Sequence, residues 1–298
     1  MKIKDAQRIV NEYRGKSILS EVEEFSFIEA LEFLIDKTKD TKYMIELGGY
    51  YYEHKKYDLA FKYYEMADTY GDKWAAEGLG YIYYYGRTGV VDYPKAFFYF
   101  EKASKAGYFN STLKVADMYK HGYGVEEDHQ KYKEMIEEAY AYVNTHRGND
   151  YHKPSVYTRL ASIYKKEGRK EEAIELYLEA KDILKWRIRV DHFWGSINVM
   201  KWLIQDVYTL MDIDLNHLDL FDLFVVLDKP NKVKFYYEEK EYEIEAIEEE
   251  GDIVIHFMDK WYRTIDGFFY NASIDGEMLV VLAESLYNFS LEKEYGNH

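Results

Sequence analysis

Small residues recur along this chain at a fixed interval of 36 residues. The interval joins Ala60 to Ala96, Ala67 to Ala103, Gly71 to Gly107, Gly86 to Gly122 and Ala103 to Ala139. A period of this length is typical of a solenoid, because one helix–turn–helix unit cannot bury its own apolar face and has to stack on the next. Since arrays of this kind present long binding surfaces, the period also favours binding over catalysis.

The period divides most of residues 1–212 into helical repeat units. A polar segment at residues 144–154 interrupts it, and the apolar pattern of residues 190–211 predicts a helix that caps the array. Ser26 and Glu29 have the spacing of a capping box and predict a helix that begins there. The predicted units are residues 43–71, 74–107, 111–139, whose second helix is degenerate, and 156–180.

Packing alone accounts for the residues that repeat. Gly48, Gly80, Ala116 and Ala161 are expected to let a second helix approach closely, because they have little or no side chain. Asp92, followed by Tyr-Pro, is expected to start a helix, since the fixed φ of proline suits the first turn. Recognition is therefore expected at positions that the repeat leaves free.

The second and third units share a glycine loop and a set of small and aromatic residues. In the second unit these are Leu79, Gly80, Tyr83, Gly86, Val90, Asp92, Lys95, Ala96, Tyr99, Phe100, Lys102, Ala103 and Gly107, and in the third Ala116, Tyr119, Gly122, Gly124, Val125, Asp128, Lys131 and Ala139. With these residues the chain resembles the Sel1-like repeat family, a relative of the tetratricopeptide repeats. The first and fourth units lack the glycine loop and are closer to tetratricopeptide units. The resemblance covers about half of the chain and implies an α-solenoid that binds proteins.

In tetratricopeptide-like arrays the first helix of each pair lines a concave groove, so the resemblance implies which free positions face a partner. One end of this groove would be aromatic and the other polar, with three lysines. Such a surface suits an extended or helical peptide with apolar side chains and an acidic terminus. The alternative is that Tyr84 and Tyr85 only pack between helices. The implied groove residues are Tyr52, Glu53, Trp74, Glu77, Tyr81, Tyr84, Tyr85, Asn110, Asp117, Lys120, His121, Ser162, Lys165 and Lys166.

Residues 213–298 differ in kind from the repeats and are expected to form a small α+β domain. Within residues 241–247, apolar residues alternate with glutamates, which is typical of a half-buried antiparallel strand. Residues 232–237 and 253–257 are expected to be neighbouring strands, and a final helix is predicted from about Gly276. The segment from Trp261 onward looks like the tails of uncharacterised bacterial repeat proteins.

The net charge of the chain is −16, from 55 acidic and 39 basic residues. An acidic surface repels the phosphate backbone, so nucleic-acid binding is not expected. Residues 231–298 alone carry 16 acidic and 6 basic residues. The chain has no cysteine, no evident signal peptide and no run of about 18–20 apolar residues that would span a membrane. We therefore expect a cytoplasmic protein without membrane insertion.

No pattern in the sequence predicts a catalytic, cofactor or metal site. Residues 212–216 have the acidic start of a calcium loop, but Gly and Glu are missing at its sixth and twelfth positions. Asp266, Asp275 and Glu277 are the strongest candidate carboxylate cluster, although Asp-Gly pairs are first of all turn formers.

Three functions remain open from the sequence. The first is a non-catalytic adaptor that binds a protein or peptide in the groove. The second is an immunity or antitoxin-type inhibitor, in which the acidic tail masks a basic partner by charge complementarity. The third is an enzyme with its site in the C-terminal domain.

Overall fold

The computed structural model of the chain describes residues 1–16, 19–146, 150–191, 195–212 and 218–291. The chain forms two compact units, Met1–Ile136 and Glu137–His298, and the division falls within helix α8. The N-terminal unit contains helical repeats, and the C-terminal unit contains the remaining helices and an antiparallel sheet.

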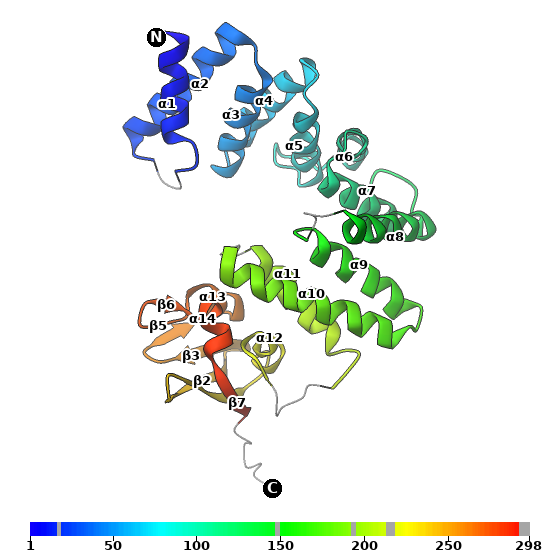
Figure 1. Ribbon diagram of the computed structural model, residues 1–298, viewed down its shortest axis with the longest axis vertical. Coiled ribbons are helices and arrows are strands. Elements are labelled where there is room, and N and C mark those ends of the chain that lie inside the picture. The colour runs from blue at the N-terminus through cyan, green and yellow to red at the C-terminus, as the bar shows by residue number, and fades with distance from the viewer. Residues whose placement is uncertain (17–18, 147–149, 192–194, 213–217, 292–298) are drawn as a thin grey trace. The chain divides into compact units, whose positions relative to one another are not determined.

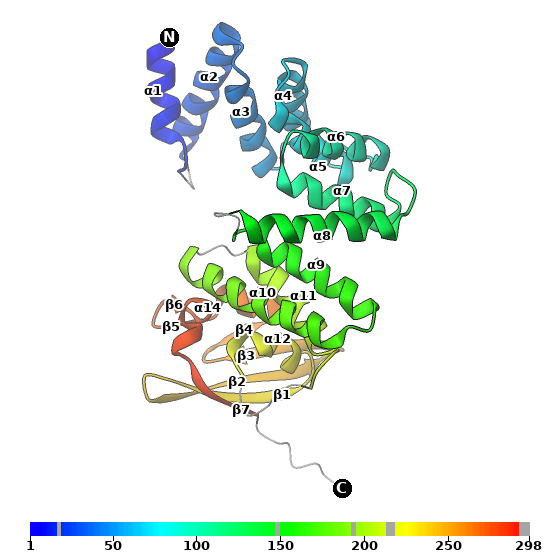
Figure 2. The same cartoon turned by 45° about the vertical axis from the view of Figure 1, so that its right-hand side comes forward.

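The N-terminal unit is built from helices that follow one another as successive neighbours (Figures 1 and 2). Helices α3 and α4 pack together, as do α5 and α6, which confirms the first two predicted helix pairs. Asp92 caps α6 as expected, because its carboxylate accepts a hydrogen bond from the amide of Lys95 at 3.0 Å. The helices are α1 (Ile3–Tyr13), α2 (Glu21–Thr38), α3 (Thr41–Glu53), α4 (Tyr57–Thr69), α5 (Lys73–Tyr84), α6 (Tyr93–Lys105), α7 (Phe109–His121) and the start of α8 (His129–Thr145).

The capping box predicted at Ser26 and Glu29 was wrong. Helix α2 already begins at Glu21, with Ser20 as its N-cap. The Glu23 side chain accepts the backbone amide of Ser20 at 2.9 Å, and the Ser20 hydroxyl accepts the amide of Glu23 at 3.4 Å. The bonds from the Ser20 amide and hydroxyl, helped by Lys16, lower the pKa of Glu23 to about 2. The same Ser-x-x-Glu spacing therefore occurs twice, and the earlier one starts the helix.

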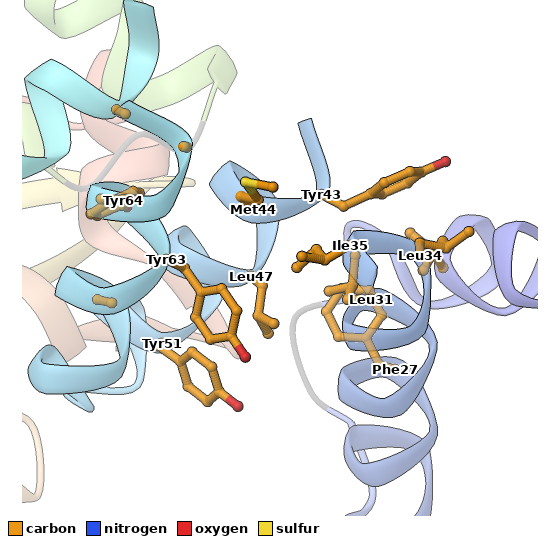
Figure 3. Packing of buried hydrophobic residues seen from close by; sticks show 14 of the residues in the cluster. Phe27, Leu31, Leu34, Ile35, Tyr43, Met44, Leu47, Tyr51, Tyr63 and Tyr64 are labelled. Carbon is orange, nitrogen blue, oxygen red and sulfur yellow. The ribbon is translucent and has the colours of Figure 1, made fainter. Parts of the chain in front are cut away.

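Tyr64 of α4 holds two repeats together because glycines flank its ring. A Cβ atom built on Gly48 of α3 would lie 2.8 Å from the ring, and one built on Gly78 of α5 would lie 2.6 Å from it. Figure 3 shows the rest of this core, in which Met44 and Leu47 of α3 lie between Ile35 of α2 and the tyrosines of α4. Glycine thus gives α3 and α5 room for the ring of Tyr64.

The same principle operates in the next repeat. A Cβ atom on Gly80 of α5 would lie 2.7 Å from the ring of Phe100 of α6. Gly124, in the loop after α7, has a positive φ of 74°, and its Cβ would lie 2.2 Å from the carbonyl oxygen of Tyr93. Both the conformation and the close approach require glycine at that position.

The C-terminal unit begins with the end of α8 and two further helices, α9 (Lys153–Lys166) and α10 (Lys170–Asp191), which pack together and correspond to the fourth predicted repeat. The predicted cap over residues 190–211 is helix α11 (Gly195–Val207), which is shorter than expected. Of its predicted apolar face, Ile197, Met200, Ile204 and Val207 are buried, whereas Met211 lies beyond the helix end and is exposed.

A buried polar cluster connects α10 to the segment that leads into the sheet. The ammonium of Lys181 lies 2.8 Å from Asp222 and 3.0 Å from Asp219, and the hydroxyl of Tyr208 donates to Asp222 at 2.8 Å. Burial disfavours the charged form of Asp219, but the attraction of Lys181 and Lys185 outweighs it and lowers the pKa of Asp219. Asp222 is only 3% exposed, so these ion pairs are part of the core of the unit.

Five antiparallel strands form the sheet, in the order β4-β3-β2-β1-β7. The alternation in β2 is confirmed, because Tyr242, Ile244 and Ala246 are buried on one face. Helix α13 packs on β3 and β4, and Phe268 of α13 meets Phe257 of β3 at a centroid distance of 6.0 Å. The elements are η1 (Leu220–Asp222), α12 (Leu223–Val226), β1 (Asn231–Tyr237), β2 (Lys240–Glu249), β3 (Asp252–Phe257), β4 (Lys260–Tyr262), α13 (Ile265–Asn271), β5 (Ser273–Ile274), β6 (Glu277–Met278), α14 (Leu279–Leu282), η2 (Ala283–Ser285) and β7 (Tyr287–Leu291).

The final helix predicted from Gly276 was wrong in its length and in its place as the last element. Only the short α14 and the 3₁₀ turn η2 are helical there, and the described chain then ends in strand β7. This strand pairs with β1, so that Phe289 stacks on Phe235 at 5.2 Å between centroids. A ring buried on the sheet face stabilises the strand more than a short helix could be stabilised by its own hydrogen bonds.

Candidate functional site: a surface of tyrosines and cations

The end of α5 brings three of the predicted groove tyrosines together. Tyr81 and Tyr85 lie one turn apart with nearly parallel rings, 6.1 Å between centroids, and Tyr84 meets Tyr85 edge-on at 5.0 Å. Tyr84 also contacts Phe100 and Tyr93 of α6. Tyr84 therefore does pack between helices, as the alternative interpretation held, while Tyr85 remains 46% exposed.

Arg87 joins these tyrosines to the preceding repeat. Its guanidinium lies over Tyr85 at 4.9 Å from the ring centroid, over Tyr57 of α4 at 5.1 Å and over Tyr52 of α3 at 6.0 Å. Tyr52 and Tyr57 also contact each other at 5.3 Å. One cation thus lies against rings from two adjacent repeats.

Lys114 of α7, in the following repeat, also lies against the tyrosines of α5. Its ammonium lies 4.9 Å from the ring centroid of Tyr84 and 5.7 Å from those of Tyr81 and Tyr85. Sequence reasoning missed both, because Arg87 lies in the loop after α5 and Lys114 was not among the α7 positions that the resemblance assigned to the groove. We call the connected set the cation–tyrosine surface, and it consists of Tyr52, Tyr57, Tyr81, Tyr84, Tyr85, Arg87 and Lys114.

The hydroxyl of Tyr84 has a raised pKa. Burial, and then the nearby Tyr85, Tyr93 and Asp117, raise its pKa to about 12. The hydroxyl therefore stays neutral at physiological pH and can act as a hydrogen-bond donor. The influence of Asp117 also places that predicted groove residue close to this end of the surface.

Trp74 and Glu77 lie toward the other end of α5. Trp74 is 58% exposed in the first turn and contacts Tyr108 at 4.7 Å between centroids. Glu77 accepts a hydrogen bond from the buried hydroxyl of Ser111 at 3.0 Å, which ties α5 to α7. Burial raises the pKa of Glu77, although the bond from Ser111 acts in the opposite direction. Glu77 therefore has a packing role in this structure.

The remaining groove residues of the N-terminal unit are on α7. Lys120 lies over the ring of Tyr132 at 5.3 Å, and His121 stacks on Tyr123 at 5.3 Å. Tyr123 in turn stacks on Tyr93 at 4.4 Å and meets Tyr84 at 6.3 Å. Aromatic contacts therefore continue from the cation–tyrosine surface to His121.

Lys165 and Lys166 belong to the C-terminal unit. The ammonium of Lys165 pairs with Asp206 of α11 at 2.7 Å, and Asp206 also accepts the hydroxyl of Tyr177. Lys166 is exposed. The cations that lie against the groove tyrosines are Arg87 and Lys114 of the N-terminal unit.

The three carboxylates considered for catalysis are either paired with a lysine or exposed to solvent. Asp266 pairs with Lys201 of α11 at 2.8 Å, whereas Asp275 and Glu277 are exposed around the β5–β6 turn. Across the described ranges, no cluster of three or more His, Asp or Glu side chains could hold a metal ion. The calcium-like segment falls largely on residues 213–217, outside the described residues.

Acidic side chains on the outer face of the sheet have basic neighbours. Lys232 lies 3.1 Å from Glu243 and 3.5 Å from Glu245, and Lys234 lies 3.7 Å from Glu241. The strands therefore offset part of the acidic charge of the tail internally.

A scan against protein families finds no matching family, and a search of curated proteins finds no relative. None of the described helices is long and apolar enough to cross a membrane. Two of the solved structures that are similar to this chain are repeat or SLR-fold proteins. A Sel1 repeat protein from Oxalobacter formigenes has 18% identity and a TM-score of 0.45, over 70% of this chain and 90% of that one.

The other is a protective antigen of uropathogenic Escherichia coli strains that displays an SLR fold, with 17% identity and a TM-score of 0.48. It is matched over 72% of this chain and 50% of its own length. Both scores are below 0.5, so the repeat architecture rests on the helix pairs and glycine contacts of this chain. The chain therefore consists of paired helices with glycine contacts between them and ends in a five-stranded sheet.

Proposed function

We propose that this chain is a non-catalytic adaptor that binds a protein or peptide through the cation–tyrosine surface. The observation that carries the proposal is that Tyr52 of α3, Tyr85 at the end of α5 and Lys114 of α7 are linked through Arg87 and shared rings. Tyr and Arg side chains of this kind dominate binding energies at protein interfaces. The repeated residues Gly48, Gly80 and Phe100 are committed to packing, so recognition falls to the positions around them.

A pull-down with the tagged full chain tests the proposal, and the structure suggests which side chains to change. Tyr81→Ala combined with Tyr85→Ala removes two rings at the surface, whereas Tyr84 is better left because it supports α6. Phe98→Ala is the matched control, since Phe98 is an aromatic residue of α6 that is 59% exposed. We expect the control to retain the partner and the double variant to lose it at least tenfold. A partner that survives in the double variant, with unchanged circular dichroism, would refute the proposal.

A second candidate is the inhibitor that binds a basic partner through the acidic tail. It is supported by the exposed side chains of Glu248, Glu249, Glu250 and Asp252 around the β2–β3 turn. It predicts a basic partner whose binding weakens steeply with salt and is lost when the three glutamates are changed to Gln. The same pull-down separates the candidates, because this partner would be unaffected by the tyrosine changes.

A further inference from the structure

The two cations of the cation–tyrosine surface lie over more rings than Lys62 and Lys120, which lie over one ring each, and than five other ring-bound lysines of the N-terminal unit. Each of those five lies over one aromatic ring and also pairs with a carboxylate. Arg87 and Lys114 each lie over three rings, and neither has a carboxylate partner within the described residues. The five are Lys16 with Glu23, Lys37 with Asp36, Lys42 with Asp40, Lys56 with Glu24, and Lys95 with Asp92.

The sequence around Arg87 contains no acidic residue that could balance its charge. Residues 78–91, which carry Tyr81, Tyr84, Tyr85 and Arg87, contain no acidic residue at all. In a chain with 55 acidic residues in 298, a gap of this length at the tyrosine cluster sets the local charge apart from the acidic average.

A ring holds a cation without neutralising it. The negative face of the ring attracts the charge, but the net charge remains available to an incoming anion. Because Lys114 is half-buried, a carboxylate that reached it would meet a lower effective dielectric than at the open surface, and the pair would be stronger. The rings also hold the two cations in place, which reduces the entropy lost on binding.

We propose that the cation–tyrosine surface binds an acidic peptide segment, whose carboxylates pair with Arg87 and Lys114 and whose apolar side chains lie on the tyrosines. This rests on the proposed function and specifies the chemistry of its partner. Both cations lie within 6 Å of the Tyr85 ring centroid, so closely spaced acidic residues in the peptide can reach both.

Single-stranded nucleic acid also combines anionic groups with rings that stack on tyrosine. The net charge of −16 opposes a phosphate backbone over its whole length, whereas a short peptide with two or three acids needs only the local site. The acidic peptide is therefore the occupant that the charge distribution favours.

The test uses fluorescence anisotropy with the full chain and three labelled probes. The first is a ten-residue peptide of Glu, Phe, Leu and Ser, the second has each Glu replaced by Gln, and the third is an oligothymidylate of ten nucleotides. The variant is Arg87→Gln with Lys114→Met. The matched control is Lys95→Met, because Lys95 lies 5.0 Å from the ring centroid of Tyr83 but already pairs with Asp92.

We expect the acidic peptide to bind at least tenfold more tightly than the Gln peptide, and the double variant to remove this preference while Lys95→Met retains it. Binding that is equal for the two peptides, unchanged in the double variant, stronger for oligothymidylate, or absent for the acidic peptide would overturn the proposal. Equal binding of both peptides that is lost with Tyr81→Ala and Tyr85→Ala would leave the adaptor function standing. If all three probes fail while the pull-down partner depends on the tyrosines, only the acidic chemistry is wrong.

Discussion

The cations of the cation–tyrosine surface in the N-terminal unit and the buried lysine of the C-terminal unit have different surroundings. Residues 1–136 carry 20 basic and 23 acidic residues, whereas residues 137–298 carry 19 basic and 32 acidic ones. In the first unit Arg87 and Lys114 lie on tyrosine rings. In the second, Lys181 lies between Asp219 and Asp222, with 13% of its side chain exposed. A cation between carboxylates is already compensated and fixes the fold, whereas a cation on rings keeps its charge for a ligand.

The largest effect should come from the ion pairs of the C-terminal unit. Asp222→Ala removes an acceptor of Lys181 and of Tyr208, and should lower the free energy of unfolding of that unit by about 3–5 kcal/mol. Amide hydrogen exchange under increasing urea reports each unit by itself. Asp228→Ala, at an exposed position, is the control and should change little. Equal loss of protection in residues 1–136 would contradict the division between the units.

In the N-terminal unit, stability should depend more on apolar packing than on ion pairs. Gly78→Ala places a methyl group 2.6 Å from the ring of Tyr64, and should destabilise this unit by about 1–3 kcal/mol because the ring has no free space to move into. Gly49→Ala is the matched control, since its Cβ would lie 3.7 Å from Tyr64. Within a helix, alanine there should stabilise by about 0.5–1 kcal/mol. Thermal unfolding of both variants decides the matter, and equal shifts in Tm would show that the glycine contact is unimportant.

The smallest expected effect is the change of the free energy of unfolding with pH. Asp219 in the C-terminal unit and Glu77 in the N-terminal unit contribute to it with opposite signs. The pKa of Asp219 is lowered in the folded state, so its stabilisation is present above pH 4 or so and is lost as the pH falls through its folded pKa. The pKa of Glu77 is raised, so its contribution is present below about pH 4.3 and is lost as the pH rises through its folded pKa.

Glu77→Gln should therefore stabilise the N-terminal unit at pH 7 by up to about 1 kcal/mol, because the amide keeps the Ser111 bond without a buried charge. Urea unfolding at pH 4 and pH 7 measures this, and the gain should shrink at the lower pH. A gain that is larger at pH 4 than at pH 7 would show that the burial of this carboxyl has been assigned the wrong sign.

Much of the N-terminal fold could be predicted because its signals are local and repeated. Gly80 lies where the ring of Phe100 needs space, and Asp92 caps α6, in both cases within one repeat. The helix start was predicted six residues late because Ser20 and Ser26 have the same capping pattern. The local sequence does not show which of two such patterns begins the helix. This is decided by how many residues of the helix pack against its neighbours.

The C-terminal sheet was predicted only where the alternation was long enough. Strand β2 was predicted from the alternation over residues 241–247, but β7 has only five residues and comes after an apolar run that resembles a helix. Its place is decided by pairing with β1, about 50 residues earlier in the sequence. Such a long-range pairing leaves no periodic signal within the strand itself.

In the candidate site, too, some residues were predicted from the sequence, whereas their contacts depend on the tertiary structure. Tyr52, Tyr81, Tyr84 and Tyr85 were predicted from helix position, but their association with Arg87 and Lys114 was not. A ring can hold a cation from any neighbouring repeat, so the pairing depends on how three helices stack and not on spacing along the chain.

The sequence by itself determined the helical repeats, the small residues at helix contacts and the acidic half-buried strand, because each is a periodic pattern imposed by local geometry. Tertiary structure decided which charges are compensated, since this depends on side chains brought together from different elements. It placed Lys181 between carboxylates and Lys114 between tyrosines, although both are lysines on amphipathic helices. That difference separates a residue that holds the fold from one that we propose to meet a partner.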